Sequence, residues 1–237
     1  MSDMKKIFYM LLCSLAFVSC EYDNYEAPSS RFHGKIVYDG ETLAFGYNEV
    51  YIELWELGDW SLKEAIRVNV NIDGTFSQVL FDGDYKMVIP KAARPFLMEQ
   101  DTVLVHIRGN KEMDIEVTPY YTIEDVKYNY NKETDKLECT CAVRQVVTDP
   151  ELAKEVDIIR EYVGKTAYLY QGSQINWHTL NTQNNPGGSL DNVIFSGPAV
   201  NSSNLPASQN YIFGRVAVQV KGITPMLMTH PKKITFR

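Results

Sequence analysis

The residue types most often used in catalysis are few and scattered in this sequence. Its four histidines lie far apart in the chain, and there is no H-E-x-x-H pattern, in which one helix offers two histidines to a zinc ion. Neither a G-x-S-x-G nucleophile turn nor a phosphate-binding glycine loop occurs. We therefore expect no catalytic residues, no cofactor and no metal site, and we interpret the chain as a non-enzyme. The histidines are His33, His106, His178 and His230.

Paired carboxylates are the remaining catalytic candidates. Glu124 and Asp125 are adjacent, and Asp82 and Asp84 flank a glycine. Two carboxyl groups can share general acid and base roles, and oxygen ligands suit calcium. At a β turn, however, such carboxylates are more often solvated. We favour solvated turns and keep a calcium site at Asp82 and Asp84 as the alternative.

Four cysteines raise the question of redox or metal chemistry. Cys139 and Cys141 form a C-x-C pair, and in a strand both side chains point to the same face, where neighbours at this spacing pair badly as a disulfide. A single C-x-C without a second cysteine pair is weak evidence for zinc. We interpret both residues as buried strand positions.

The other two cysteines lie in an amino-terminal segment typical of a signal peptide. Lys5 and Lys6 precede the apolar run 7–18. About 12 residues rise only about 18 Å as a helix, too little for a hydrocarbon core of roughly 30 Å.

The end of that run, Phe17-Val18-Ser19-Cys20, resembles the lipobox of bacterial lipoproteins. The resemblance implies a signal peptide over residues 1–19, cleavage before Cys20, and lipids on the Cys20 sulfur that hold the protein at a membrane. An ordinary secretory signal with a chance cysteine is the alternative, but it would place a small residue where Phe17 or Val18 stands.

Residues 20–30 are polar and acidic, and they predict a lipidated, flexible tether. They resemble the acidic stretch that directs Bacteroidetes lipoproteins to the outer face of the outer membrane, so we expect a cell-surface location. A solvated spacer is the alternative. The formal charge is −7, and loss of Lys5, Lys6 and Asp3 removes a net +1, which leaves −8. An acidic chain of this kind is a poor partner for nucleic acid.

After the tether, short alternating runs separated by Asp-Gly turns predict an all-β domain over residues 31–118. Residues 92–99 contain Pro95 and predict a loop or one helical turn. The expected strands are Arg31–Asp39, Glu49–Glu56, Val68–Ile72, Phe76–Leu80, Tyr85–Ile89, Thr102–Ile107 and Met113–Thr118, with turns at Asp39-Gly40, Asp73-Gly74 and Asp82-Gly83.

These segments carry a family resemblance. Gly34 through Val37, Asp73-Gly74 with Phe76, and Gly83 with Tyr85 follow the order of the carboxypeptidase regulatory-like, transthyretin-like β-sandwich. More narrowly, the whole chain resembles the DUF3823 type of Bacteroidetes lipoproteins, found beside glycan-uptake outer-membrane genes. We expect Phe76 and Tyr85 to be core residues; the transthyretin-like fold implies no catalytic set.

Residues 119–237 predict a second β-sandwich, immunoglobulin-like or equally fibronectin-like, with a boundary near Pro119. Leu152, Val156, Ile159 and Val163 stand at helical spacing, so a short helix or a loop crossing is expected within 149–162. The expected strands are 123–131, 137–147, 166–171 and 211–221, with 233–237 closing the chain.

The segment 172–210 is rich in Asn, Ser, Gly and Pro, and it contains Trp177 and His178. A long irregular segment is often functional. Trp177 and His178 are candidate ligand-binding residues, in which the tryptophan stacks on a sugar ring and nearby Asn and Gln side chains bond its hydroxyls. A tryptophan that caps the core is the alternative, and it is the one we favour. Trp55 and Trp60 have the same two interpretations.

Three functional hypotheses follow. The first is a glycan-binding or scaffold lipoprotein of an outer-membrane polysaccharide uptake system, with the membrane, a glycan and outer-membrane transporter proteins as partners. The second is a structural or adhesin-type module for protein partners. The third, an enzyme, lacks a supporting motif. A solvent-exposed, concave aromatic cluster in the structure, such as a tryptophan with an open face, would favour the first.

Overall fold

The computed structural model describes residues 26–59, 63–171, 178–200 and 205–236. Cys20, Trp60 and Trp177 lie outside these residues. Within the described part, no helix is long and apolar enough to span a membrane. The described residues form strands, with one 3₁₀ turn, Lys91–Ala93. This confirms the predicted all-β class and its two domains.

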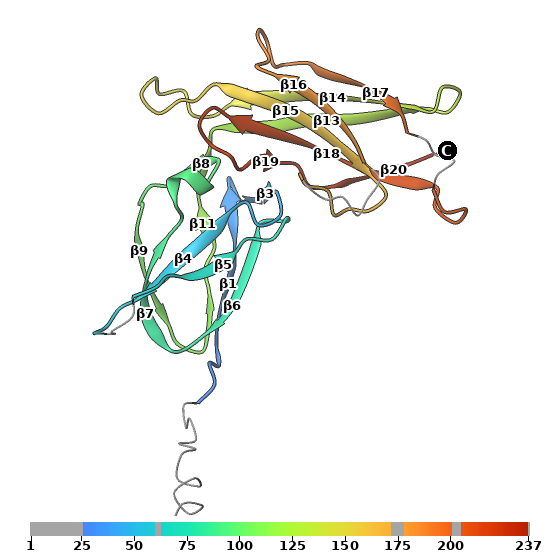
Figure 1. The fold of residues 1–237 in the computed structure, drawn as a ribbon. Coiled ribbons are helices and arrows are strands. Elements are labelled where there is room, and N and C mark those ends of the chain that lie inside the picture. The colour runs from blue at the N-terminus through green and yellow to red at the C-terminus, as the bar shows by residue number, and fades with distance from the viewer. Residues whose placement is uncertain (1–25, 60–62, 172–177, 201–204, 237) are drawn as a thin grey trace, which may run out of the picture.

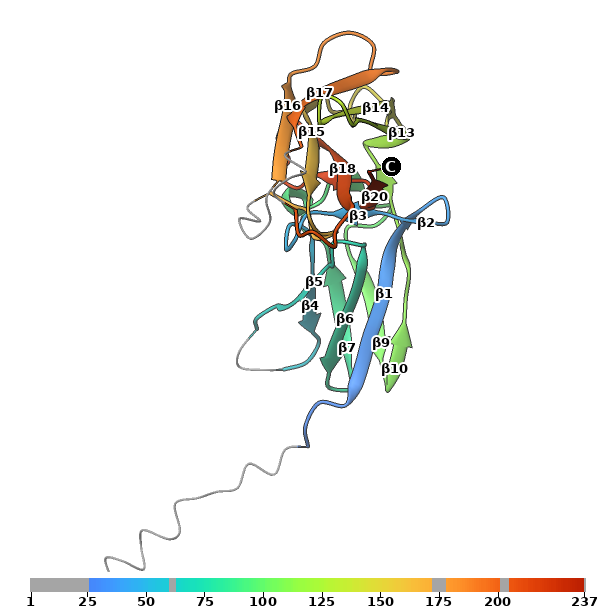
Figure 2. The same ribbon diagram turned by 90° about the vertical axis from the view of Figure 1, so that its right-hand side faces the viewer.

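The first domain is a sandwich of two sheets (Figures 1 and 2). In one sheet β1 pairs with β2, β6, β10 and β11, and the other has the order β5-β4-β7-β9. A two-stranded ladder of β8 and β12 lies beside them. The bounds are β1 Ser30–Tyr38, β2 Glu41–Thr42, β3 Ala44–Phe45, β4 Tyr51–Glu56, β5 Ile66–Asn69, β6 Thr75–Leu80, β7 Gly83–Val88, β8 Phe96–Leu97, β9 Val103–Ile107, β10 Asn110–Glu112, β11 Ile115–Glu116 and β12 Thr118–Pro119.

Apolar residues from both sheets form the core of this domain, as their alternation along the strands predicts. Phe76 and Tyr85 are 2% and 1% exposed, which confirms both as core residues. The buried Tyr85 hydroxyl donates to the Phe81 carbonyl oxygen at 2.9 Å. The Asp39-Gly40 turn joins β1 to β2 with positive φ at both residues, as a two-residue hairpin requires.

The second domain is also a pair of sheets, and its strands run across one end of the first domain (Figure 1). The sheet β13-β14-β17 faces a larger sheet in which β15 lies between β16 and β18, and β18 also pairs with β19 and β20. The bounds are β13 Tyr121–Asn131, β14 Lys136–Gln145, β15 Val156–Gly164, β16 His178–Asn184, β17 Val193–Ala199, β18 Tyr211–Val220, β19 Leu227–Met228 and β20 Lys232–Thr235.

Three expectations for this domain differ from the structure. Within 149–162 the expected loop crossing extends to Glu155, but no helix follows, because the helical spacing around Ile159 belongs to strand β15. Glu161, between apolar positions, is buried in this strand. Residues 166–171 are not a strand, because β15 ends at Gly164 and the chain continues as a connection. The segment 172–210 is not irregular throughout, since it contains β16 and β17.

The cysteine interpretation is confirmed. Cys139 and Cys141 are free thiols on the same face of β14, 0% and 3% exposed, and both belong to the core between the two sheets.

The two domains are joined by strand pairing as well as by sequence. β3, from the first domain, adds to the larger sheet of the second through antiparallel pairing with β19. Phe45 of β3 and Leu227 of β19 both lie in the core of the first domain. The junction is therefore a continuous part of both folds.

Candidate functional site

An exposed cluster of three tyrosines lies at the domain junction and is the strongest candidate for a binding surface. We call Tyr47, Tyr168 and Tyr170 the tyrosine cluster. The ring centroids of Tyr47 lie 5.6 Å from Tyr168 and 5.2 Å from Tyr170, and those of Tyr168 and Tyr170 are 5.3 Å apart. Tyr47 is 45% exposed and Tyr168 is 43% exposed. Large aromatic side chains are rarely left this open in a group, so the cluster is a candidate contact surface.

The two domains contribute to the cluster from different directions. Tyr47 follows β3 in the first domain, whereas Tyr168 and Tyr170 come from the connection after β15 in the second. Between the latter two, Leu169 is fully buried against the outer face of β15 and β18. Along this connection Leu169 is thus buried, Tyr168 is exposed and Tyr170 is half-buried.

Buried polar contacts fix the backbone beneath Tyr47. The Glu49 carboxylate accepts a hydrogen bond from the Met226 backbone N–H at 2.9 Å, across the domain boundary. It also lies against Gly46, where an added Cβ would meet the carboxyl carbon at 2.2 Å. Burial raises the pKa of Glu49, while the Met226 N–H and the guanidinium of Arg215 act in the opposite direction.

A row of hydrogen-bonding groups continues from the tyrosine cluster along β15. The Arg160 guanidinium donates from Nη1 to the Gln171 side-chain oxygen at 2.9 Å and from Nε to Thr182 Oγ1 at 3.1 Å. Gln171 directly follows Tyr170 in the chain. Aromatic faces beside an amide, a hydroxyl and a guanidinium are the groups from which sugar-binding surfaces can be built.

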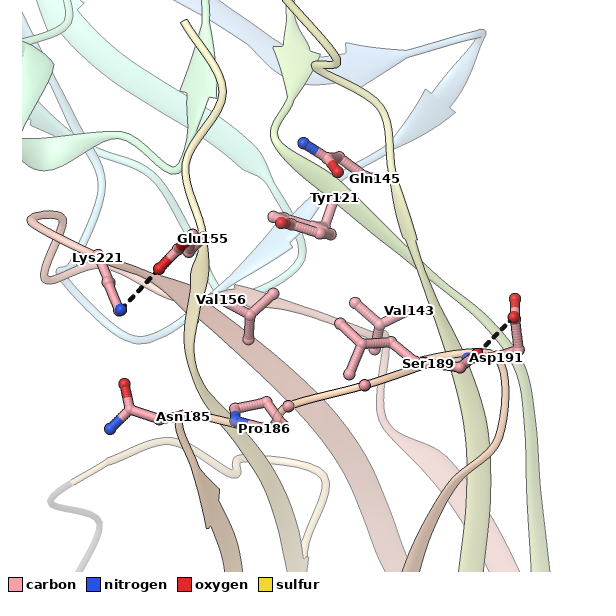
Figure 3. Close-up of a pocket in the computed structure, with 13 residues that line it drawn as sticks. Tyr121, Val143, Gln145, Glu155, Val156, Asn185, Pro186, Ser189, Asp191 and Lys221 are labelled. Carbon is pink, nitrogen blue, oxygen red and sulfur yellow. Dashed lines mark hydrogen bonds and ion pairs between the residues drawn. The ribbon is translucent and has the colours of Figure 1, made fainter. Parts of the chain in front are cut away.

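A groove in the second domain is a second candidate (Figure 3). It has a volume of about 570 Å³, and Val143 and Val156 form part of its apolar wall. The Lys221–Glu155 ion pair, 2.7 Å between Nζ and Oε2, lies on one side. On the other side the Ser189 hydroxyl donates to Asp191.

The charged groups of this groove are partnered by the protein itself. Arg144 pairs with Asp191, which also accepts the Ser189 hydroxyl. The pKa of Asp191 is lowered by the hydroxyl of Ser189 and by the Arg144 guanidinium. Because a ligand would have to displace these contacts, the groove is a weaker candidate than the tyrosine cluster.

The residues singled out in the sequence occupy separate places. His178 opens β16 opposite Gly164, and its side chain is outside what the structure describes. Trp55, in β4, is half-buried, and its indole N–H donates to Glu53 at 3.2 Å. The binding roles of Trp177 and His178 and the lipidation of Cys20 stay predictions.

Asp82 and Asp84 have separate protein partners. Asp82 accepts from the Ser30 hydroxyl and the Gly109 N–H, whereas Asp84 lies 2.8 Å from His106 Nδ1. The hydroxyl of Ser30 and the imidazole of His106 are the main causes that lower the pKa values of Asp82 and Asp84 respectively. In the part of the chain that the structure covers, no three His, Cys, Asp or Glu side chains are grouped to hold a metal ion.

Sequence reasoning missed the tyrosine cluster and Arg160. The high tyrosine count, 15 in the chain, was a signal. So was the Tyr168-x-Tyr170 spacing, which was assigned to a strand. Neither feature indicates Tyr47 as the third member, because the cluster exists only after the two domains dock.

Fold and site together define a two-domain, all-β protein with an aromatic surface at its domain junction. The chain belongs to the DUF3823 family. Residues 30–118 match the family model "Protein of unknown function (DUF3823) N-terminal domain", and residues 121–233 match "Domain of unknown function (DUF3823_C)". This confirms the family resemblance in the sequence.

Solved structures share the whole architecture. A DUF3823 family protein from Parabacteroides merdae ATCC 43184 is 23% identical, with a TM-score of 0.72, covering 89% of this chain and 100% of that one. Another, from Bacteroides ovatus ATCC 8483, is 22% identical, with a TM-score of 0.70 and coverage of 88% and 100%.

A third structure, from Bacteroides uniformis ATCC 8492, is named a "putative carbohydrate binding protein". It is 14% identical, with a TM-score of 0.69 and coverage of 88% and 100%. At these identities the likeness concerns the fold. No curated protein matches the sequence.

Proposed function

We propose that this protein is a lipid-anchored lipoprotein of the cell surface that binds glycan, as a component of an outer-membrane polysaccharide uptake system. In this role it holds a glycan and does not cleave it. The observation that carries the proposal is the exposed tyrosine cluster. The name of the Bacteroides uniformis structure and the family resemblance give further support.

The chemistry of the cluster suits a sugar. A pyranose ring has an apolar face of C–H groups, which packs on an aromatic ring, while its hydroxyls need donors and acceptors at the edge. Tyr47 and Tyr168 are exposed aromatic side chains, and Gln171, Thr182 and Arg160 offer polar groups nearby. Because the backbone beneath Tyr47 is fixed by Glu49, little order has to be gained on binding.

Affinity electrophoresis tests the binding part. The full chain, purified in detergent, is run through gels that contain members of a broad polysaccharide panel. We expect at least one glycan to retard the wild type, and Tyr47→Ala and Tyr168→Ala to lower the affinity about tenfold, the loss of one stacking contact.

Tyr51→Ala is the matched control, because that ring lies in the first domain under the Arg67 guanidinium, 3.8 Å from its centroid. It should leave retardation unchanged. If no polysaccharide retards the wild type, the glycan-binding proposal is wrong. A protein complex that is recovered from membranes, and whose assembly is unaffected by added glycan, would then favour a module for protein partners.

The anchor is tested separately. Cells are grown with an alkyne analogue of palmitate, and the protein is probed for label and for membrane association. Cys20→Ser should abolish both, since its sulfur is the proposed acceptor, whereas Cys13→Ser should keep both. Label that survives Cys20→Ser would refute the anchor without affecting the glycan proposal.

A further inference from the structure

The charge beside the tyrosine cluster indicates which kind of glycan it takes. Arg160 has three hydrogen-bond partners among the described residues, and all are neutral. These are Thr182 Oγ1 at 3.1 Å, the Gln171 side-chain oxygen at 2.9 Å and the Tyr162 hydroxyl at 3.4 Å. No carboxylate oxygen in the described chain lies within 4.0 Å of its guanidinium. The cation is therefore held in place without being neutralised by direct contact.

The partners of Arg160 leave part of its guanidinium available. Thr182 takes the Nε–H, and Gln171 and Tyr162 take both N–H groups of Nη1. A guanidinium carries five N–H donors in a planar fork. The two donors of Nη2 have no partner among the residues that the structure describes, so Nη2 is the nitrogen of Arg160 that is left for a ligand acceptor.

The nearby charges do not cancel Arg160. Among the described residues, Arg160 and Arg215 both act on the Glu49 carboxylate, and Glu49 and Arg215 make hydrogen bonds across the domain junction. With the Glu49 carboxylate ionised, the three groups sum to +1, and with it protonated they sum to +2. This local excess stands out in a chain whose formal net charge is −7.

We propose that the tyrosine cluster and Arg160 form one site for an acidic saccharide. The ring of a uronic acid packs on an exposed tyrosine face, and its carboxylate accepts hydrogen bonds from Arg160. In a uronic acid the carboxylate is attached directly to the ring, so stacking and the charged contact are made by one sugar unit. This inference rests on the proposed function and names its ligand class.

A carboxylate is favoured over a neutral acceptor because its hydrogen bond to a guanidinium is charge-assisted and about twice as strong as a neutral one. Since the Nε–H and both Nη1 N–H groups of Arg160 already have partners, the carboxylate accepts from Nη2. Gln171 and Thr182 keep the guanidinium in one orientation, so a planar acceptor on the neighbouring sugar loses little freedom. A sulfated polymer is therefore included in the test as the competing anion.

The test compares one polymer with and without its charge. The full chain in detergent is titrated with polygalacturonate, with the same polymer after chemical reduction of its carboxyl groups, and with a sulfated neutral polymer. We expect polygalacturonate to bind about tenfold or more tightly than the reduced form, and its affinity to fall as salt is raised.

Variants locate the effect. Arg160→Gln should lower affinity for polygalacturonate about tenfold and leave binding to the reduced polymer unchanged. Arg160→Lys keeps the charge and should retain part of the preference. Arg144→Gln removes an exposed arginine that pairs with Glu124 and Asp191 and should change nothing. Circular dichroism verifies that each variant is folded.

The outcomes separate this inference from the proposed function. Equal binding of charged and reduced polymers, lost in Tyr47→Ala, overturns the acidic-saccharide site and keeps a glycan site. A preference for the sulfated polymer overturns the carboxylate. If no glycan of the broad panel binds, the proposed function fails as well. If Arg160→Gln does not fold, three measurements still test the acidic-saccharide site. These are the preference of the wild type for the charged polymer, the salt dependence of its binding, and the affinity of Arg160→Lys.

Discussion

Arg215 of the second domain donates a hydrogen bond from Nη2 to the backbone carbonyl oxygen of Phe45 in the first, at 3.3 Å, although 170 positions separate the two in the chain. The same guanidinium donates to the carbonyl oxygens of Thr229 and Leu169, both at 2.9 Å, and reaches that of Ile72 at 3.5 Å. Arg215 is completely buried. One side chain thus satisfies backbone acceptors from both domains at their junction.

Replacement of this side chain should destabilise the protein strongly. Arg215→Met keeps much of the volume but leaves buried carbonyls without a donor and removes one of the two arginines that act on Glu49. Breaking a buried charged network from one side costs about 3–5 kcal/mol. Urea denaturation followed by fluorescence measures the loss. Arg31→Met, at an exposed arginine, is the control, and a loss below about 1 kcal/mol for Arg215→Met would contradict the role given to Arg215.

Gly34 shows why a motif residue of the first domain must be glycine. An added Cβ would lie 1.9 Å from the Met113 carbonyl oxygen, a backbone atom that cannot easily move. Gly34→Ala should therefore cost about 1–3 kcal/mol, as for other overpacking substitutions. At Gly187 an added Cβ meets nothing within 4 Å, so Gly187→Ala should be nearly neutral. Equal stabilities of the two variants would show that the strands shift apart without cost.

Local patterns predicted much of the first domain, because its strands bury alternate residues between tight turns. β15 shows where this reasoning fails. Its pairing with β18 is irregular between Val156 and Ile158, so the inward face shifts by one residue. Val156, Ile159 and Val163 are buried, and their spacing imitates a helix. Only the partner strand distinguishes the two interpretations.

Strand β16 was missed for another reason. Its sequence, HTLNTQN, has little apolar alternation, and its register is set by seven paired positions along β15. The tyrosine cluster was missed because Tyr47 meets Tyr168 and Tyr170 only through the docked domains. Strand-forming tendency is local and can be predicted from sequence, whereas a surface shared by two domains depends on contacts made across more than a hundred residues.

The two thiols of β14 should be unreactive in the folded protein. Burial raises the pKa of Cys139 far above its ordinary value and that of Cys141 to about 11, with the Glu161 charge acting in the same direction. Near pH 8 roughly one Cys141 in a thousand is then a thiolate, the reactive form.

A chain that carries Cys13→Ser and Cys20→Ser isolates these two groups. With a chromogenic disulfide reagent we expect no rapid reaction in buffer and two thiols per chain in concentrated guanidinium chloride. Rapid reaction of either thiol in buffer would contradict their burial. A slow reaction would instead measure the rate at which the sandwich opens and exposes the thiols.

Glu161 should make the stability depend on pH. It is 1% exposed inside the second domain, where the Asn181 amide donates to Oε2 at 2.5 Å and Oε1 has no partner among the described residues. Burial raises the pKa of Glu161 from 4.5 to about 7, against the lowering effect of the Asn181 hydrogen bond. The neutral form is therefore the one that the fold prefers.

The direction of the effect follows from proton binding. Between pH 4.5 and about 7 the folded chain keeps the Glu161 proton while the unfolded chain has released it. The free energy of unfolding contributed by this group is fully present below pH 4.5 and is lost as the pH rises through about 7. The total loss is roughly 3 kcal/mol.

Glu161→Gln keeps the shape and an acceptor for Asn181 but cannot ionise. Urea denaturation of both proteins across this pH window gives two stability curves, and their difference removes contributions from all other groups, including Glu49. We expect the free energy of unfolding of the variant, relative to that of the wild type, to increase steadily as pH rises, because only the wild type must hold an ionisable group in its core. Parallel curves would mean that Glu161 is solvated in the folded state, and the core around Cys139 and Cys141 would then have to admit water.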